Sequence, residues 1–244
     1  AISHLFDACS NKMTEPCYSK NPDNGIAISS IIRAFHCPRQ YFFYKDIPSK
    51  PAIEYSICKL VSCAEESATE EELWKTLHLI HPEISEDKRN FLRDCLMAME
   101  HAPVRPWTET DIVVRSERAG IHGLLDKYHA QTGEYTLTRC TTAPKNGCWA
   151  EDAIRTAALL LCIEEAGAVK TPGMNIEYVR SGIIRYYEPT PKDRRRVLHL
   201  IQQVKEIEDG EFPHKPLNPP CSRCRFSDRC AQNAPRRLSF LFKK

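Results

Sequence analysis

The stretch Gly120-Ile-His-Gly-Leu-Leu-Asp-Lys-Tyr128 decides the fold class of this chain. Its apolar residues lie between turn-forming segments, which predicts a β-strand. The stretches 111–115 and 134–140 have the same character, so three strands are expected in succession. A strongly apolar segment at 151–166 then predicts a helix. This order of strands and helices predicts a mixed α/β core.

The pattern extends in both directions from this core. Residues 174–187 supply one or two further strands, and Thr190 followed by Pro191 predicts the start of another helix. Upstream, Ser29 is expected to cap a helix that ends at Pro38 and leads into an aromatic segment. Further helices are expected over 52–68, 69–80 (opened by a capping box of Thr69 and Glu72) and 85–99.

The composition is that of an ordinary soluble globular protein. Of the 244 residues, 42% are hydrophobic and 27% are charged, and the longest apolar stretch is far too short to span a bilayer. The first residues lack the basic and apolar segments of a secretion signal. The chain has 12 cysteines, and without such a signal they favour a reducing cytoplasm, where thiolates can bind metals.

Four cysteines stand out by their spacing. Cys37 lies in His36-Cys-Pro-Arg-Gln-Tyr41, and the C-terminal run from Cys221 through Cys224 to Cys230 has the spacing C-x2-C-x5-C. Three close thiolates need a fourth ligand, for which Cys37 is the best candidate. The spacing favours an iron–sulfur cluster over zinc, because zinc sites are usually built from two short paired knuckles; disulfides come third. Buried free thiols account for the other eight cysteines.

Basic residues gather in the last third of the chain, whereas residues 65–87 are strongly acidic. Arg39, Arg223, Arg225 and Arg229 lie next to the cysteines in sequence. Such a basic cluster is consistent with contacts to a phosphate backbone, and a solvated charged face is the alternative. These four arginines are therefore the DNA-binding candidates.

The cysteine frame, the aromatic residues after Cys37 and the Gly123-Leu-Leu-Asp126 strand together resemble the CRISPR-associated RecB-like exonucleases, the Cas-four family. The resemblance covers residues 28–230. It implies a PD-(D/E)XK nuclease core, a [4Fe-4S] cluster on the four cysteines, binding of DNA ends or single strands, and a partnership with the CRISPR integrase. On this basis the chain is expected to divide into four regions: an N-terminal extension (1–27), a helical region with the first cluster cysteine (28–110), the RecB-like core (111–210), and a cluster-binding segment with a basic tail (211–244).

The catalytic positions of the family are mostly replaced here. By the resemblance, Ser62 stands at the position of the family's His, and the family's strand Asp is kept as Asp126. The next strand has Thr138 and Cys140 where the family has an acid and a Lys. On the following helix, Arg155 and Leu159 replace the family's Gln and Tyr. One carboxylate cannot hold a catalytic metal pair of Mg²⁺ or Mn²⁺. The prediction is a degenerate nuclease in which Asp126 is vestigial or simply structural.

Alternatives remain open. A rearranged centre could use Glu134, although it lies about 13 Å from the expected place along its strand, and other conceivable ligands are Glu151, Asp152, His122, His129 and Glu177. In function, the first hypothesis is a non-catalytic DNA-binding or scaffold subunit in CRISPR spacer acquisition or DNA processing. The alternative is an active metal-dependent 5′ to 3′ single-stranded DNA exonuclease, and a third hypothesis is a redox-sensing interaction protein.

Overall fold

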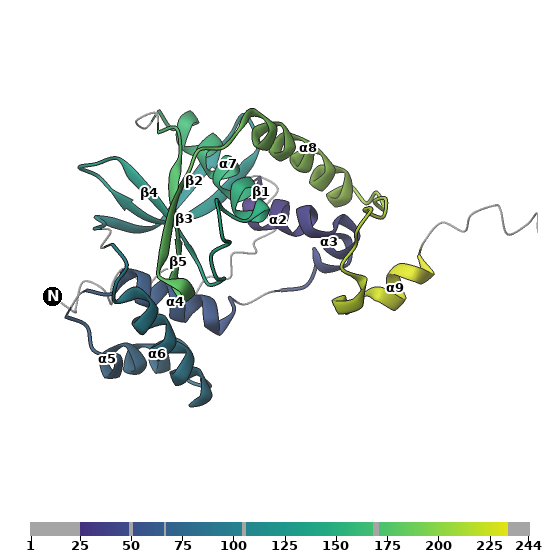
Figure 1. The fold of residues 1–244 in the computed structure, drawn as a ribbon. Helices are drawn as coiled ribbons and strands as arrows, with labels where there is room; N and C mark the ends of the chain where they lie inside the picture. Colours follow the sequence, from purple (N-terminus) through teal and green to yellow (C-terminus); the bar gives the residue numbers. More distant parts are fainter. Residues whose placement is uncertain (1–24, 49–50, 66, 104–105, 168–170, 234–244) are drawn as a thin grey trace, which may run out of the picture.

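The computed structural model describes residues 25–48, 51–65, 67–103, 106–167 and 171–233. The predicted N-terminal extension and basic tail therefore lie almost entirely outside the described residues. In the described part, a mixed sheet is covered by helices, as the sequence predicts (Figure 1). The strands are β1 (Ile26–Ala27), β2 (Glu109–Ser116), β3 (Ile121–His129), β4 (Glu134–Arg139), β5 (Met174–Tyr178) and β6 (Ile183–Tyr187).

The sheet has the order β1-β3-β4-β5-β6, and β2 also pairs with β3. The β1–β3 and β4–β5 pairs are parallel, and the other pairs are antiparallel. A parallel pair needs a crossover, which α7 (Ala150–Glu165) provides between β4 and β5. The β3–β4 pairing ends at Lys127 and Thr136, so the two strands separate at Asp126. This separation leaves the Asp126 side chain inside the sheet rather than at a strand end.

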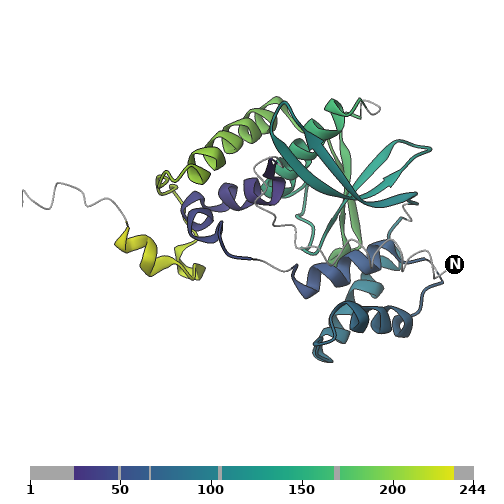
Figure 2. The ribbon, with the colours of Figure 1, turned by 180° about the vertical axis from the view of Figure 1, so that it is seen from behind.

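The helices form two groups. Helix α7 packs with α2 (Ile28–His36) and α8 (Pro191–Glu208) on the main apolar core, which also takes side chains from β3 and β4. At Gly123 an added Cβ would lie 2.6 Å from Ile28 Cδ1, so glycine allows α2 to approach the sheet closely. The second group, which has its own apolar core, consists of α4 (Ile53–Cys63), α5 (Glu70–Ile80) and α6 (Asp87–Met99) (Figure 2).

Helix boundaries follow local sequence signals with two exceptions. The predicted capping box at Thr69 opens α5. Thr190 opens α8 as predicted, and Asp193 completes a second capping box there. The first helix, however, begins at Ile28 with Ala27 as its N-cap, so the prediction of Ser29 as the cap is wrong. The helix expected over 52–68 already ends at Cys63, where the backbone becomes extended.

Cys37 lies at the junction of two helices, as the sequence predicts. It is at once the C-cap of α2 and the N-cap of α3 (Pro38–Tyr44), and Pro38 at the first position of α3 explains why the chain turns there. The aromatic segment after Cys37 is therefore helical. Beyond α8, the short helices η3 (Cys221–Arg223) and α9 (Ser227–Gln232) lie beside α3, at the far end of the molecule from β4 (Figure 1).

No helix among the described residues combines the length and the apolar character that crossing a bilayer would require.

Candidate metal-cluster site and the buried centre of the sheet

The four predicted cluster cysteines line one pocket. Cys37 comes from the α2–α3 junction, Cys221 and Cys224 come from η3 and the residue after it, and Cys230 comes from α9. The space between the lining atoms is about 330 Å³, part of it open to solvent. All four cysteines are free thiols. The fold thus brings together sulfur atoms that are almost 200 residues apart in sequence.

The arrangement of these thiols differs from a compact single-ion site. Among the described residues, no three His, Cys, Asp or Glu side chains are placed to hold one metal ion. Four thiolates on one zinc ion lie about 3.8 Å apart, given Zn–S bonds near 2.3 Å. The thiolates of a [4Fe-4S] cluster bind different iron atoms, so they lie farther apart. The two kinds of site therefore differ in the separation of sulfur atoms that they require.

The surroundings of Cys37 favour its neutral thiol. Burial raises the pKa of Cys37, and the nearby Cys224 and Cys230 raise it further, although the backbone N–H groups of Gln40 and Arg39 oppose this. Arg39 Nη1 lies 3.9 Å from Cys230 Sγ, and its Nε donates to the Pro213 carbonyl at 2.9 Å. A positive charge close to Cys37 would favour its thiolate.

Arginines and aromatic rings surround this pocket. The guanidinium of Arg225 lies over the rings of Tyr44 and Phe226, at 4.6 and 4.7 Å from their centroids, and Arg229 lies 5.2 Å from the Phe43 centroid. Arg223, Arg225 and Arg229 are exposed. Arg39 is instead buried and packs over Phe212, so it orders the cysteine segment from within.

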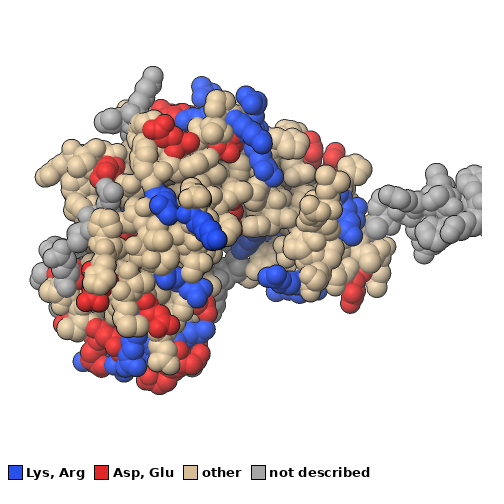
Figure 3. All heavy atoms as spheres, viewed as in Figure 1, with Lys and Arg blue, Asp and Glu red and all other residues tan. Residues whose placement is uncertain are grey.

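Charge is unevenly spread over the surface in the view of Figure 3. Acidic side chains gather over the α4–α6 group, together with some basic ones, whereas the sheet and the α8 side carry several Lys and Arg side chains with acidic ones among them. Several of the acidic residues are paired: Glu70 binds both Arg89 and Arg93. The α4–α6 group therefore presents neutralised ion pairs rather than an open basic surface.

Asp126 is held in the centre of the sheet by three donors. Lys59 Nζ lies 2.9 Å from Asp126 Oδ1, the Tyr55 hydroxyl donates to the same oxygen at 2.7 Å, and the Thr138 N–H donates to Oδ2 at 2.8 Å. The Lys59 ammonium also lies 3.0 Å from Asp111 Oδ1. It thus bridges two carboxylates from neighbouring strands, and Asp126 lies within β3 rather than in a turn.

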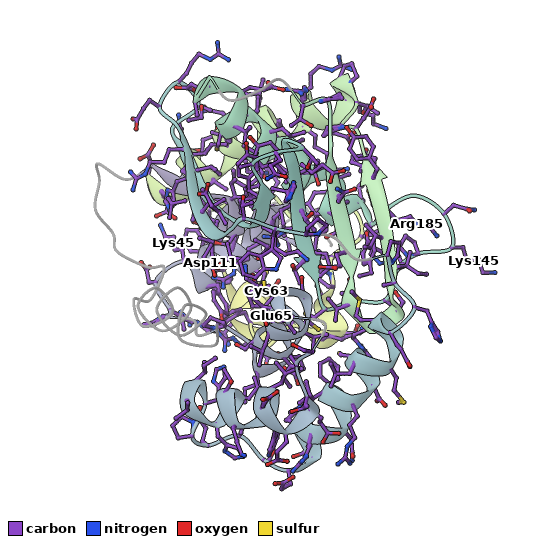
Figure 4. All side chains as sticks on the ribbon, turned by 90° about the vertical axis from the view of Figure 1, so that its left-hand side faces the viewer. Lys45, Cys63, Glu65, Asp111, Lys145 and Arg185 are labelled. Carbon is purple, nitrogen blue, oxygen red and sulfur yellow. The ribbon has the colours of Figure 1, made fainter. Side chains whose placement is uncertain are left out.

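Asp111 adopts an unusual backbone conformation to reach this position. Its φ is +55°, in the left-handed region that non-glycine residues rarely occupy. The residues on either side of Asp111 pair with those on either side of Asp126, so the two aspartates lie opposite each other across β2 and β3. Burial alone would lower the pKa of Lys59, but Asp126, Cys63 and Asp111 raise it above its ordinary value. Cys63 and Asp111 lie near each other where α4 meets the sheet (Figure 4).

A second buried ion pair lies beside the first. Lys127 Nζ is 2.7 Å from Glu177 Oε2 and donates to the Ser62 carbonyl at 3.0 Å. The Ser62 hydroxyl donates to Glu177 and lies 3.0 Å from Thr138 Oγ1. Glu177 on β5 is the register partner of Thr138 on β4. A carboxylate is therefore present one strand away from the position where the resemblance expects one, but an ammonium neutralises it.

Three other residues that the sequence offered as metal ligands make contacts away from the central lysines. Glu151 binds His36 and Arg139, and Asp152 pairs with Arg139 and accepts from the Tyr178 hydroxyl. His129 contacts Thr132 near the surface. Leu159 is a core residue of α7, and Arg155 pairs with Glu151 at 3.7 Å.

Lys59, Lys127 and Asp111 were not identified from the sequence. The signal that could have found the first is Ile57-Cys-Lys-Leu-Val61, a run in which a single charge interrupts a buried stretch of α4. Because lysine is almost never fully buried without a partner, such a position predicts a buried carboxylate. Sequence alone does not say which carboxylate this is.

Comparison with known proteins shows a fold shared with a solved structure. No family model matches the sequence. A protein of Archaeoglobus fulgidus, described as an "Uncharacterized protein", is 28% identical over 127 residues, which are 52% of this chain and 57% of that protein. The chain therefore matches just over half the length of this relative. A crystal structure of a "putative exonuclease" from Eubacterium rectale superposes with a TM-score of 0.56 and 12% identity, covering 94% of this chain and 97% of that one. The two chains share a fold.

Proposed function

We propose that this protein is a DNA-binding, iron–sulfur member of the RecB-like exonuclease group that has lost its nuclease chemistry. It would act as a scaffold or DNA-binding subunit in CRISPR spacer acquisition or a related DNA-processing assembly. The observation that carries the proposal is the Lys59 ammonium between Asp111 and Asp126. This geometry puts an internal cation among the carboxylates that a divalent metal would need.

Metal-dependent cleavage of a phosphodiester requires carboxylates that are open to a divalent ion and to water. Here each of the three central carboxylates contacts a lysine, and the side chains of Asp126, Lys127 and Glu177 are 3% exposed. Ser62 and Thr138 cannot act as the missing histidine and acid. The lysines therefore offset the negative charge of these buried carboxylates, which supports a structural rather than a catalytic role.

The proposed [4Fe-4S] cluster would be held by Cys37, Cys221, Cys224 and Cys230. A group bound by thiolates at both ends of the chain closes a long loop and so stabilises the folded state. In this place it would supply a structural link between the α2–α3 junction and the C-terminal segment. Arg39, buried beside Cys230, would partly offset the negative charge of the thiolates.

DNA would lie against the exposed arginines of the C-terminal segment. Arg225 and Arg229 are placed over aromatic rings by cation–π contacts, which holds their charge at the surface in a fixed position. Neutralising phosphates with such residues gives affinity without sequence preference. This supports binding to DNA ends or single strands.

The test uses protein purified without oxygen. Iron and sulfide analysis is expected to give about four of each per chain, and a mobility-shift assay is expected to show DNA binding that weakens with salt. Labelled single-stranded DNA with Mn²⁺ or Mg²⁺ is expected to stay intact. Cleavage that Asp126→Asn abolishes would overturn the loss of nuclease chemistry, and zinc in place of iron would overturn the cluster.

A further inference from the structure

Three cysteines outside the cluster pocket converge where the α4–α6 group meets the sheet. Cys58 comes from α4, Cys95 from α6, and Cys140 from the residue after β4. The sulfur atoms of Cys58 and Cys95 are 3.9 Å apart. Cys140 packs against the apolar cluster that contains these two residues, and its thiol interacts with that of Cys58. Cys58 and Cys95 belong to the apolar core of the α4–α6 group, and Cys140 lies at its edge. Neither the proposed cluster nor the central ion pairs involve them.

Exposure differs sharply among these three thiols. Cys58 is 0% and Cys95 is 1% exposed, whereas Cys140 is only partly buried. A reagent from solvent therefore meets Cys140 first, and the thiol behind it is Cys58. This is the arrangement of an accessible sulfur with a neighbouring resolving thiol.

From this geometry we infer that Cys140 and Cys58 form a reversible thiol switch that responds to hydroperoxides. The product is a disulfide between the end of β4 and helix α4. It would tie the α4–α6 group covalently to the sheet. Cys95, in contact with Cys58, is the partner for later thiol–disulfide exchange.

The chemistry balances in two steps. The Cys140 thiolate attacks the distal oxygen of the hydroperoxide: an S–O bond forms, the O–O bond breaks, and the alkoxide leaves and takes up a proton as the alcohol, or as water for H₂O₂. The Cys58 sulfur then attacks the Cys140 sulfur: an S–S bond forms, the S–O bond breaks, and the hydroxide leaves as water with the Cys58 proton. Two thiols lose two electrons, and the hydroperoxide gains them.

The surroundings of Cys140 favour its thiolate. Interaction with the Cys58 thiol lowers the pKa of Cys140 to about 6; burial opposes this, and the neighbouring Arg139 adds to the lowering while Glu54 works against it. Cys148 is buried to a similar degree, but burial together with Asp152 and Asp193 raises its pKa to about 11. Cys148 is therefore a matched control for reactivity.

The experiment treats the full-length holoprotein with H₂O₂, blocks free thiols with N-ethylmaleimide and maps disulfide-linked peptides by mass spectrometry. The expected product is a Cys58–Cys140 peptide that dithiothreitol releases. Peptide mapping separates it from any oxidation of the four cluster cysteines.

Variants make the inference falsifiable. Cys140→Ser is expected to remove the disulfide, and Cys148→Ser to leave it unchanged. A Cys58–Cys95 disulfide that depends on Cys140 also supports the switch. The inference is overturned if Cys140→Ser still forms a Cys58 disulfide at the wild-type rate, or if Cys140 is oxidised only to sulfinic or sulfonic acid.

Discussion

The Lys59 ammonium lies 2.9 Å from the Asp126 carboxylate and 3.0 Å from that of Asp111, in a position that is 2% exposed. Two carboxylates that face each other across adjacent strands would repel each other without a cation between them. In this protein a side chain from α4 supplies that cation. Helix α4 is thereby coupled to the sheet by charge as well as by apolar packing, and replacement of Lys59 tests this relationship directly.

Lys59→Met is expected to destabilise the fold by about 3–5 kcal/mol, because it leaves buried carboxylates without their ammonium partner. The free energy of unfolding in urea measures this. Lys88→Met is the control, since Lys88 pairs with Glu54 at the surface and its loss should change little. A Lys59→Met protein as stable as the wild type would contradict the assignment of Lys59 as the central cation.

A divalent ion should substitute for the missing side chain. In Lys59→Ala, the oxygens of Asp111 and Asp126 are left facing a space, and carboxylates are the ligands that Mn²⁺ prefers. Mn²⁺ is expected to raise the melting temperature of this variant, by an amount equivalent to about 2.7 kcal/mol at a concentration 100 times its Kd, and to leave the wild type unchanged. Equal effects on Lys59→Ala and Lys88→Ala would mean that the ion binds elsewhere.

The sequence predicted the strands and helices well because their apolar periodicity and capping residues are local. It placed Cys37 at a helical junction because Pro38 must interrupt α2. The central ion pairs could not be predicted, since the partners of Lys59 depend on how β2 and β3 are registered against α4. The same limit applies to Glu177, which reaches the centre only because β5 pairs with β4 in parallel.

Glu151 should contribute to stability in a pH-dependent way. Its hydrogen bond with His36, with help from Arg139 and Arg155, lowers the pKa of Glu151 from 4.5 to about 2. The folded-state pKa is depressed, so the contribution is fully present above about pH 5 and is lost as the pH falls towards 2; its upper limit is about 3 kcal/mol. Glu151→Gln should therefore be less stable than the wild type at pH 6 but similar to it near pH 2. Urea denaturation at both pH values measures the difference, and a gap that persists near pH 2 would contradict this account.

Cys37 should be required for the cluster although it is far from the other three cysteines in sequence. Cys37→Ser, purified without oxygen, is expected to lose most of its iron and its visible absorbance, because three thiolates cannot complete the set of four. Cys162→Ser, a fully buried thiol of the main core, should keep both. Equal iron content in the two variants would exclude Cys37 as a ligand.

The arginines of the C-terminal segment should set the salt dependence of DNA binding. If Arg225 and Arg229 each neutralise one phosphate of a single strand, replacing both with alanine reduces the slope of log K against log salt concentration by about 1.4. Fluorescence anisotropy with a labelled oligonucleotide, measured over a range of salt concentrations, gives this slope. Arg93→Ala is the control, because Arg93 is held by Glu70 on the acidic α4–α6 group and should not affect the slope. An unchanged slope in the double variant, with iron content intact, would place the DNA on another surface while leaving the cluster proposal in place.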